Sequence, residues 1–330
     1  MAFNTVLHQV VIMFLLMLVG YIIFKIGMIS EETAKGMTQL LLLIVTPCVI
    51  FISFQLEYSV SLVHGLLICA ASAIFVHLFS IILGHILFRS HPRSYQQRIV
   101  LRFAIIYSNC GFMGIPLLAA VIHPSELGVF YASVYIAIFS FFVWTHGVIL
   151  YKSSLKFSSG EATRKTGLVK NIIETIKSLK NIRPNPNIIA VAVGLIFFFL
   201  SIKVPVVIYD TMKYIYYLNT PIAMIIIGCR LAQVNLRTIF SEKWIWPGVI
   251  IKNLLIPLVA IFVLHLAGIS GVLLLACLLP IACPAAGNTV LMADMYGIDT
   301  KFPAKIMSVS TLLTIVTIPL LVYIVTIMKY

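Results

Sequence analysis

The sequence predicts an all-α integral membrane protein, and three observations support this fold class. Of the 330 residues, 61% are hydrophobic and only 10% are charged, whereas soluble domains carry about 25% charged residues. The apolar residues gather in runs close to the roughly 20 residues that a spanning helix needs. These runs lack the alternation over about 10 residues that is typical of spanning β-strands. We therefore expect a bundle of membrane-spanning helices.

Ten apolar segments follow one another along the chain, and each is interpreted as a spanning helix. They comprise residues 5–24, 38–56, 60–88, 99–122, 126–151, 187–202, 211–229, 245–267, 271–293 and 304–328. The first ten residues contain no Lys or Arg, and this argues against a cleaved signal peptide, which needs a basic start. Glycines and prolines interrupt the later segments and blur some of their ends.

The basic residues predict the orientation of the helices. If the N-terminus lies outside, the cytoplasmic loops contain all of the 23 Lys and Arg residues except Lys203, Lys213 and Lys329. Cytoplasmic loops of membrane proteins carry an excess of such residues. We therefore expect a multi-pass protein of the plasma membrane with both termini extracytoplasmic. Orientation and anionic lipid account for the net charge of +13, so the lipid bilayer, and not nucleic acid, is the expected partner.

The longest polar stretch divides the chain into two halves. It covers residues 152–186 and contains apolar residues at helical spacing, with lysines elsewhere on the helical wheel. This pattern predicts a cytoplasmic basic linker with an amphipathic helix on the membrane surface. Residues 1–151 would then form a first five-helix repeat, and residues 187–330 a second.

Short motifs recur between the two halves at one offset. Thr46-Pro47 returns as Thr220-Pro221, and Val19-Gly20 returns as Val193-Gly194, in both cases 174 residues further along the chain. Because each half has five spans, an odd number, the second half must be inverted across the membrane relative to the first. Inverted repeats of this kind are a common plan of secondary transporters.

The fourth and ninth spans each contain residues that weaken a helix. In inverted-repeat transporters, matching broken helices meet near the bilayer midplane, where unwound backbone and half-helix N-termini bind charged substrates. Glycine lets a ligand approach the main chain, and proline removes one backbone hydrogen bond. We expect the breaks around Pro116 and Pro284 to form one crossing point. The residues predicted to bind substrate there are Asn109, Gly111, Pro116, Pro284, Gly287, Asn288 and Thr289.

Four motifs resemble those of the auxin efflux carrier family, whose plant members are the PIN-formed proteins. They are "TPCVIF", "SNCGFMGIPLL", "RPNPNIIA" and "CPAAGNTVLMADMYGID". The resemblance runs from about the first span to the tenth. It implies a transport domain and a scaffold domain, with the fourth and ninth spans crossing at their prolines, as in bile acid/sodium symporter-like folds. A homodimer joined through scaffold helices is part of the same expectation.

The resemblance also implies how the substrate is held. The PIN-formed proteins bind the carboxylate of their substrate with asparagines that match Asn109 and Asn187, and Asn185 is a weaker companion. Bacterial relatives are associated with small dicarboxylates. This chain lacks the long hydrophilic loop of the plant members, and its third span contains His64, His77 and His85 but no carboxylate. These histidines are interpreted as interhelical or interfacial residues, and a titrating role is the alternative.

These features together predict a secondary carrier of a small organic anion, a mono- or dicarboxylate, with an elevator-type alternating-access mechanism. Sodium- or proton-coupled transport on the same fold and an anion channel remain as alternatives. A pump would usually contain a buried Asp or Glu, yet such residues lie near the ends of the spans, as Glu57 and Asp294 do. Lys252, seven residues into the eighth span, is interpreted as extending to the inner membrane face; attraction of anions is the alternative.

An enzyme is not expected, because the chain contains neither HExxH nor GxSxG and no span contains paired aspartates. The cysteines lie in apolar stretches without CxxC or metal-like spacing and are interpreted as small apolar residues. They are Cys48, Cys69, Cys110, Cys229, Cys277 and Cys283. No cofactor is expected.

Overall fold

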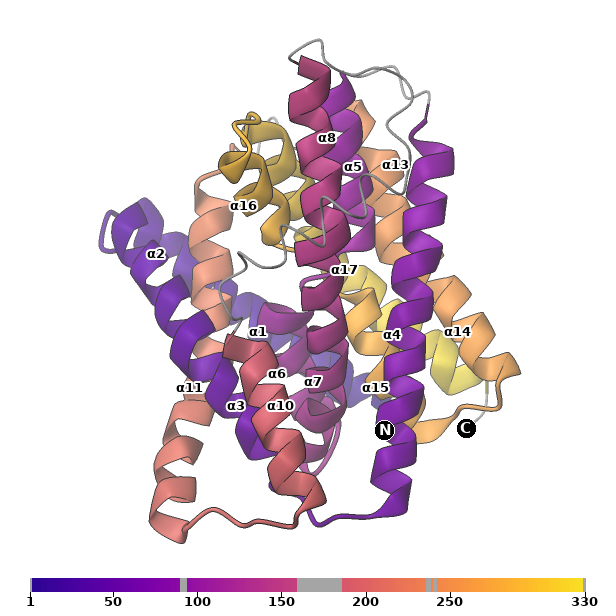
Figure 1. The fold of residues 1–330 in the computed structure, drawn as a ribbon. Helices are drawn as coiled ribbons and strands as arrows, with labels where there is room; N and C mark the ends of the chain where they lie inside the picture. The colour runs from indigo at the N-terminus through magenta and orange to yellow at the C-terminus, as the bar shows by residue number, and fades with distance from the viewer. Residues whose placement is uncertain (1, 90–93, 159–185, 236–238, 240–241, 329–330) are drawn as a thin grey trace.

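The computed structural model describes residues 2–89, 94–158, 186–235, 239 and 242–328, and within these residues the chain is helical without a named strand (Figure 1). The α-helices are α1 (Ala2–Lys25), α2 (Glu31–Leu40), α3 (Thr46–Ser53), α4 (Val60–Leu87), α5 (Tyr95–Ile106), α6 (Ile115–Val121), α7 (Ser125–Phe142), α8 (Val148–Ser158), α10 (Pro186–Phe199), α11 (Val206–Ala232), α13 (Trp246–Ile250), α14 (Ile256–Leu266), α15 (Gly271–Ala282), α16 (Asn288–Met295) and α17 (Lys301–Ile327).

Seven helices of the described chain are long and apolar enough to cross a membrane. They are Asn4–Lys25, Glu31–Ser53, Val60–Leu87, Ser125–Ser153, Val206–Ala232, Lys243–Leu266 and Lys301–Ile327. Three shorter apolar helices, Cys110–Val121, Pro186–Phe199 and Gly271–Ala282, correspond to the predicted fourth, sixth and ninth spans. The prediction of an all-helical membrane protein is therefore confirmed.

Three of the long or broken helices contain a π-helical turn directly before an Xaa-Pro pair. The turns are Leu41–Val45, Cys110–Gly114 and Ile251–Leu255, and they precede Pro47, Pro116 and Pro257. In each turn the residue before the proline donates its N–H to the carbonyl five residues earlier, as Ile115 does to Cys110. Because proline has no N–H to donate, the wider turn lets the helix continue past it.

Two glycines allow α1 and α11 to pack with their backbones in close contact. A Cβ on Gly228 would lie 2.0 Å from the carbonyl oxygen of Met17, and one on Gly20 would lie 2.2 Å from that of Ile225. Only glycine fits such a gap, and small residues bring helices together in this way inside membranes. Cys229 adds a hydrogen bond from its Sγ to the Gly20 carbonyl at 3.4 Å.

The helices form two groups, which meet through α7 and through a direct contact between α1 and α17. On one side α11 packs against α1, α2 and α3, and α3 packs against α10; on the other, α4 packs against α5, α14 and α15 (Figure 1). Helix α7 contacts α3 and α10 in the first group and α4 and α15 in the second.

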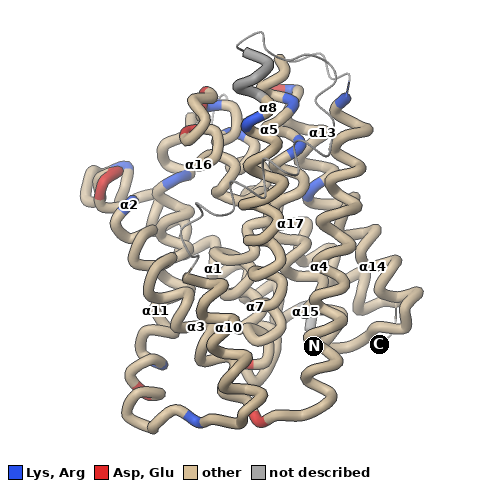
Figure 2. The backbone as a smooth tube through the Cα atoms, in the orientation of Figure 1, with Lys and Arg blue, Asp and Glu red and all other residues tan. Residues whose placement is uncertain are grey.

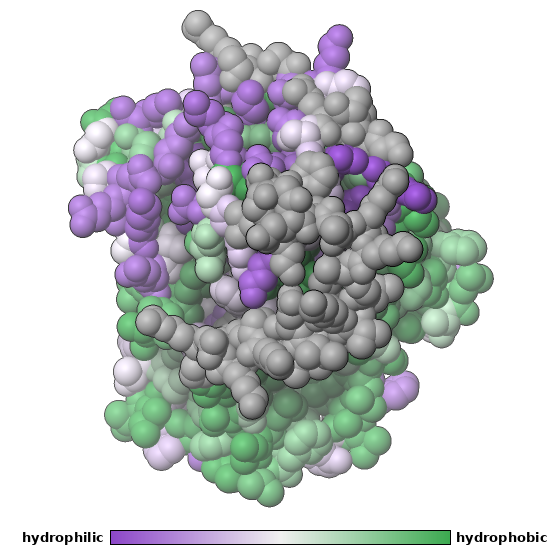
Figure 3. Space-filling model, turned by 45° about the horizontal axis from the view of Figure 1, so that its top comes forward, coloured by the Kyte–Doolittle hydropathy of each residue, from purple (hydrophilic) through white to green (hydrophobic). Residues whose placement is uncertain are grey.

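The charged residues gather at one end of the molecule. Most of the Lys and Arg residues of the described chain lie around the ends of α2, α5, α8, α13 and α16, while both chain ends lie in the opposite half (Figure 2). Hydrophilic residues crowd the same end in the space-filling view, and apolar residues cover the sides below it (Figure 3). The arrangement matches a protein whose two faces differ in charge, as the positive-inside pattern requires.

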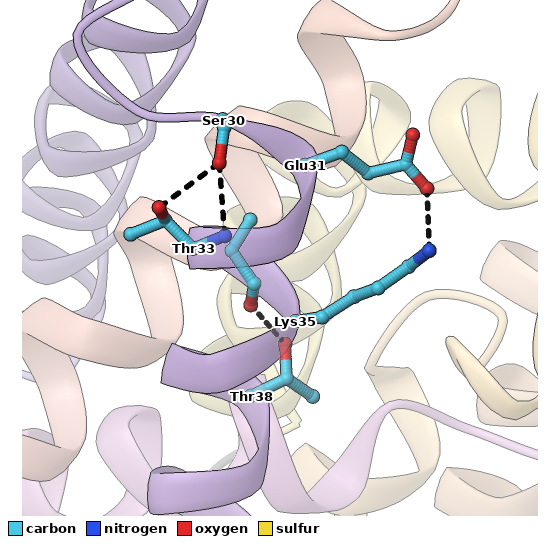
Figure 4. A network of polar contacts seen from close by, with 6 residues as sticks. Ser30, Glu31, Thr33, Lys35 and Thr38 are labelled. Atoms are coloured by element: carbon cyan, nitrogen blue, oxygen red, sulfur yellow. Dashed lines mark hydrogen bonds and ion pairs between the residues drawn. The ribbon is translucent and has the colours of Figure 1, made fainter.

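Helix α2 begins at this charged end with a well-capped first turn (Figure 4). Ser30 lies at the N-cap and accepts a hydrogen bond from the Thr33 N–H at 3.1 Å. Glu31 in the first turn pairs with Lys35 at 2.8 Å, one turn later. A hydroxyl cap and an acidic first turn both stabilise a helix start in water, which indicates that this end of the helix lies outside the apolar layer. The amphipathic helix predicted for residues 152–186 lies almost entirely outside the described residues, which resume at Pro186.

Candidate functional site

Two unwound segments from the fourth and ninth predicted spans pair with each other inside the bundle. The first follows α5 and the second follows α15. The Asn109 N–H donates to the Pro284 carbonyl at 2.7 Å, and the Ala286 N–H donates to the Tyr107 carbonyl at 2.9 Å. Ser108 thus faces Ala285 in an antiparallel bridge. Because buried backbone groups need partners in lipid-covered protein, each break supplies the hydrogen bonds that the other has lost. We call residues 107–109 and 284–286 the crossing.

Side chains from α17 and from the π-turn Ile251–Leu255 support the crossing. The Ala285 N–H, which the bridge leaves free, donates to Oγ of Ser310 at 2.9 Å. Ser310 Oγ in turn donates to Oδ1 of Asn253 at 2.6 Å, and Nδ2 of Asn253 donates to the Ser310 carbonyl at 2.8 Å. All three residues are buried. This closed network fixes the second unwound segment against two neighbouring helices.

The first break does not lie at the predicted proline. Pro116 is buried in the first turn of α6, seven residues after Asn109, and the π-turn Cys110–Gly114 absorbs its missing hydrogen bond. The unwound residues are instead Tyr107 to Asn109. The expectation that the first break surrounds Pro116 is therefore wrong, whereas Pro284 does lie within the second break.

Asn109 lies where the chain turns from the crossing into the next helical segment. Its side chain makes no capping hydrogen bond to that turn, although asparagine is among the preferred N-cap residues. The first helical bonds there run from the N–H groups of Met113 and Gly114 to the Asn109 carbonyl. A Cβ built on Gly111 would meet no atom within 4 Å, so there is open space beside this half-buried turn.

The second half of the site repeats this pattern at the start of α16. Gly287 occupies the N-cap and has no atom within 4 Å of an added Cβ, and neither it nor Asn288 is fully buried. Thr289 is buried, and its Oγ1 has no hydrogen-bond partner in the described part of the chain. Its carbonyl accepts a hydrogen bond from the Tyr151 hydroxyl at 3.1 Å. Both breaks therefore end in an amide residue, a glycine with free space beside it and a helix start.

Asn187 lies in the first turn of α10 and is half-buried. Helix α10 packs against α3 and α7, and α7 also contacts the turn Cys110–Gly114. Asn187 thus belongs to the group of helices on the other side of α7 from α15, and its role in binding remains a prediction. Asn185 lies outside the described residues.

Lys252 was interpreted from the sequence as extending to the inner membrane face, and this interpretation is wrong. Its side chain is buried, and Nζ donates to the carbonyl of Ile281 at 3.3 Å. Ile281 lies in the last turn of α15, three residues before Pro284. Sequence position alone could not reveal this, because the direction of the side chain depends on the rotation of the helix about its axis.

The histidine and tyrosine side chains beside the first break form a buried aromatic group. His77 stacks on Phe142 with ring centroids 5.0 Å apart, and its Nδ1 lies 2.7 Å from the Ala73 carbonyl. Because a carbonyl only accepts, Nδ1 carries the proton. The Tyr107 hydroxyl donates to the Phe142 carbonyl at 2.8 Å and lies 3.0 Å from Nδ1 of His146. The expected interhelical role of His77 agrees with these contacts, although its Nε2 has no partner among the described residues.

Comparison with known proteins assigns the family. The family model described as "membrane transport protein" matches residues 5–322. The chain belongs to this family. The match confirms the resemblance to the auxin efflux carriers. A similar curated protein, an "uncharacterized transporter" of Methanocaldococcus jannaschii, is 23% identical over 319 residues, which are 94% of this chain and 96% of the relative.

The family match and the apolar helices identify a multi-pass membrane transporter. Every predicted site residue in the fourth and ninth spans lies within or directly beside the crossing, except Pro116, which lies seven residues after Asn109, about two helical turns away. Three neighbours of the crossing are not among the site residues predicted from the sequence. They are Lys252, Asn253 and Ser310. A polar run "KN" inside an apolar span was the available signal for the first two.

Proposed function

We propose that this transporter is a secondary carrier of a small organic anion, a mono- or dicarboxylate, which binds at the crossing. The observation that carries the proposal is the position of Asn109, an amide that leaves its own helix start uncapped beside open space at Gly111. An N-cap hydrogen bond is worth about 0.5–2 kcal/mol. An asparagine without this bond retains its donor for another partner, and a carboxylate oxygen is a strong acceptor.

Helix starts next to the crossing add further donors. The N–H groups of Cys110, Gly111 and Phe112 precede the first helical bond of their turn, and the first N–H groups of a helix have no partner within it. Together with the positive end of the helix dipole they favour a negative charge. Asn288 and Thr289 offer the same chemistry at the start of α16, and Asn187 would complete the binding of the carboxylate.

The proposed mechanism is alternating access of the elevator type. Seven long apolar helices and three short ones would form ten spans in two inverted five-helix repeats, with broken helices four and nine crossing at the substrate. The group of helices around α4, α14, α15 and α17 would move with the crossing, and the group around α1 and α11 would remain as the scaffold. The close glycine contacts of α1 and α11 favour a rigid scaffold, and a homodimer would be joined through it.

The proposal includes location and orientation. The carrier would lie in the plasma membrane with its basic end in the cytoplasm and both termini extracytoplasmic. Among the described residues no Asp or Glu is buried, so coupling to sodium or protons would need sites made of hydroxyls and carbonyls. Uniport down a gradient is the simplest form of the proposal.

Uptake and efflux of labelled mono- and dicarboxylates in proteoliposomes, with and without sodium and a pH gradient, test the proposal. Saturable uptake with counterflow supports a carrier. Uptake without saturation or counterflow indicates a channel, and transport that stops when sodium or the pH gradient is removed indicates a coupled symporter or antiporter. Failure to transport any organic anion of the panel would refute the proposed substrate class.

A further inference from the structure

Lys252 is the one Lys, Arg, Asp or Glu side chain that is buried among the described residues. It lies in the π-turn Ile251–Leu255, within the continuous apolar helix Lys243–Leu266. Nine residues separate it from the start of that helix, which corresponds to roughly 14 Å at 1.5 Å per residue. A position this far along a 24-residue apolar helix lies inside the apolar segment and not at its end, and about 20 residues suffice to cross the roughly 30 Å hydrocarbon core. An ammonium group at this depth is costly and is typically functional.

The surroundings of Lys252 contain no carboxylate in the described chain. Its Nζ donates to the carbonyl of Ile281, in the last turn of α15 before the crossing. The titratable groups that interact with it electrostatically are Cys110, Cys283 and His77. Thiols are ordinarily uncharged at neutral pH, and His77 provides no negative charge. The helix end at Ile281 supplies only a partial negative charge, so the ammonium lacks a full countercharge.

Lys252 lies close to both helix breaks of the proposed substrate site. Cys110 begins the helical turn that follows Asn109, and Cys283 begins the second break. The neighbouring residue, Asn253, joins the network that holds the Ala285 N–H through Ser310. The ammonium therefore lies beside both broken helices, and its hydrogen bond holds it to the last turn of α15, three residues before the crossing.

From this geometry we infer that Lys252 is the fixed positive charge of the substrate site and that the transported anion is its countercharge. The inference rests on the proposed function and narrows it. One ammonium balances one negative charge, so a monocarboxylate makes the occupied site neutral, whereas a dicarboxylate leaves one negative charge in the apolar layer. The preferred substrate is a monovalent organic anion, and the site loaded with it crosses the membrane without net charge.

A charge-pairing experiment on the full-length protein tests the inference. Binding of acetate, propionate and benzoate and of their neutral amides is measured on the wild type and on Lys252→Met, Lys252→Arg and Lys305→Met. Lys305 is a half-buried lysine near the start of α17 and is the matched control. We expect Lys252→Met to lower the preference for carboxylate over amide at least 10-fold with the amide affinity unchanged. Lys252→Arg and Lys305→Met should keep the preference.

Each outcome decides between the two proposals. If the wild type prefers carboxylates and Lys252→Met retains that preference, the inference about Lys252 is wrong and the proposed function stands. If the wild type binds none of these monocarboxylates, or binds them no better than their amides, the inference fails. The proposed function then depends on the dicarboxylates of the transport panel, and it fails as well if none of them is transported. An equal loss of both ligands in Lys252→Met indicates a structural role and also overturns the inference.

A second measurement uses the unmodified protein and does not depend on the folding of a variant. Exchange of the monocarboxylate across proteoliposomes should be independent of membrane potential, because the loaded site is neutral. Exchange of succinate should change with potential. Potential-dependent exchange of the monocarboxylate in the wild type would overturn the inference.

Discussion

At the scale of single residues, the site depends on polar groups that the local backbone does not use. Asn109 donates its backbone N–H to Pro284 and accepts two helical hydrogen bonds with its carbonyl, so its main chain is fully engaged. Its side chain makes no cap. The backbone thus holds the residue rigidly while its amide is available to a ligand, which is the arrangement that precise recognition requires.

Replacing Asn109 with alanine should weaken substrate binding with little effect on folding. A hydrogen bond to a charged group contributes about 1.5–3 kcal/mol, and roughly 1.4 kcal/mol corresponds to a tenfold change in Kd. We expect an affinity 10- to 100-fold lower in direct binding measurements on purified protein. Asn4→Ala, at the exposed start of α1, is the control and should bind normally. Unchanged binding in well-folded Asn109→Ala would remove this residue from the site.

The sequence indicates which residue types belong to the candidate site, but it does not indicate in which direction their side chains point. Asn109, Gly111 and Gly287 were predictable, because an amide and glycines inside an apolar span have no use in a plain spanning helix. Lys252 was misread, because its depth was known but the rotation of its helix was not. That rotation depends on packing against neighbouring helices, and Lys252 itself lies within the wider π-turn before Pro257.

At the scale of helices, the crossing relies on a few buried contacts whose loss can be measured. Ser310→Ala removes the acceptor of the Ala285 N–H and the partner of Asn253. A buried polar group without a partner costs about 1–3 kcal/mol. We therefore expect a lower thermal unfolding temperature in detergent and weaker transport. Ser308→Ala is the control, since Ser308 lies buried in the same helix with no hydrogen-bond partner for its Oγ in the described chain. Equal behaviour of the two variants would contradict the support role of Ser310.

The contact between α1 and α11 leads to a separate prediction. In Gly228→Ala the added Cβ would lie 2.0 Å from the Met17 carbonyl oxygen, so the two backbones must move apart. Overpacking of this kind typically costs 1–3 kcal/mol. Gly36→Ala, in α2, meets no atom within 4 Å and should be neutral or slightly stabilising, since alanine is the better helix former. Thermal unfolding of the purified variants compares them, and a Gly228→Ala protein as stable as Gly36→Ala would show that the helices repack freely.

The first helix break was predictable in its span and not in its position, whereas Pro284 correctly marked the second break. Proline at 116 marked the correct segment, but a π-turn carries the helix through it. The unwound residues 107–109 contain neither glycine nor proline. They leave the helix because the segment 284–286 offers replacement hydrogen bonds, and a partner 175 or more residues away leaves no local signal in the sequence.

At the scale of the whole molecule, the distribution of charge orients the fold. The basic residues gather at one end, and both termini lie in the other half (Figure 2). The sequence predicted this asymmetry from its loops alone, because the positive-inside rule acts on composition and does not require knowledge of helix packing. The arrangement of two repeats, in contrast, depends on contacts between the halves.

Cysteine labelling tests the orientation. The native cysteines are all buried, so single added cysteines at exposed sites report with little background. We expect Lys152→Cys, at the basic end, to be protected from impermeant maleimide in intact cells and to react after permeabilisation. Glu57→Cys, between α3 and α4, should react from outside in intact cells. The reverse pattern would invert the proposed topology.

Hydrogen exchange of the backbone amides in the crossing can report on the transport cycle. The backbone N–H groups of Asn109 and Ala286 are hydrogen-bonded between the two broken helices, so they exchange with deuterium only when these two segments separate locally. If the site travels as a rigid unit, turnover leaves their exchange slow even while the surrounding helices slide. If each cycle opens the bridge, these two amides exchange at the rate of transport. Mass spectrometry of deuterated peptides during turnover would thus distinguish two mechanisms. In one, the crossing stays hydrogen-bonded while it moves; in the other, its hydrogen bonds break and re-form in each transport cycle.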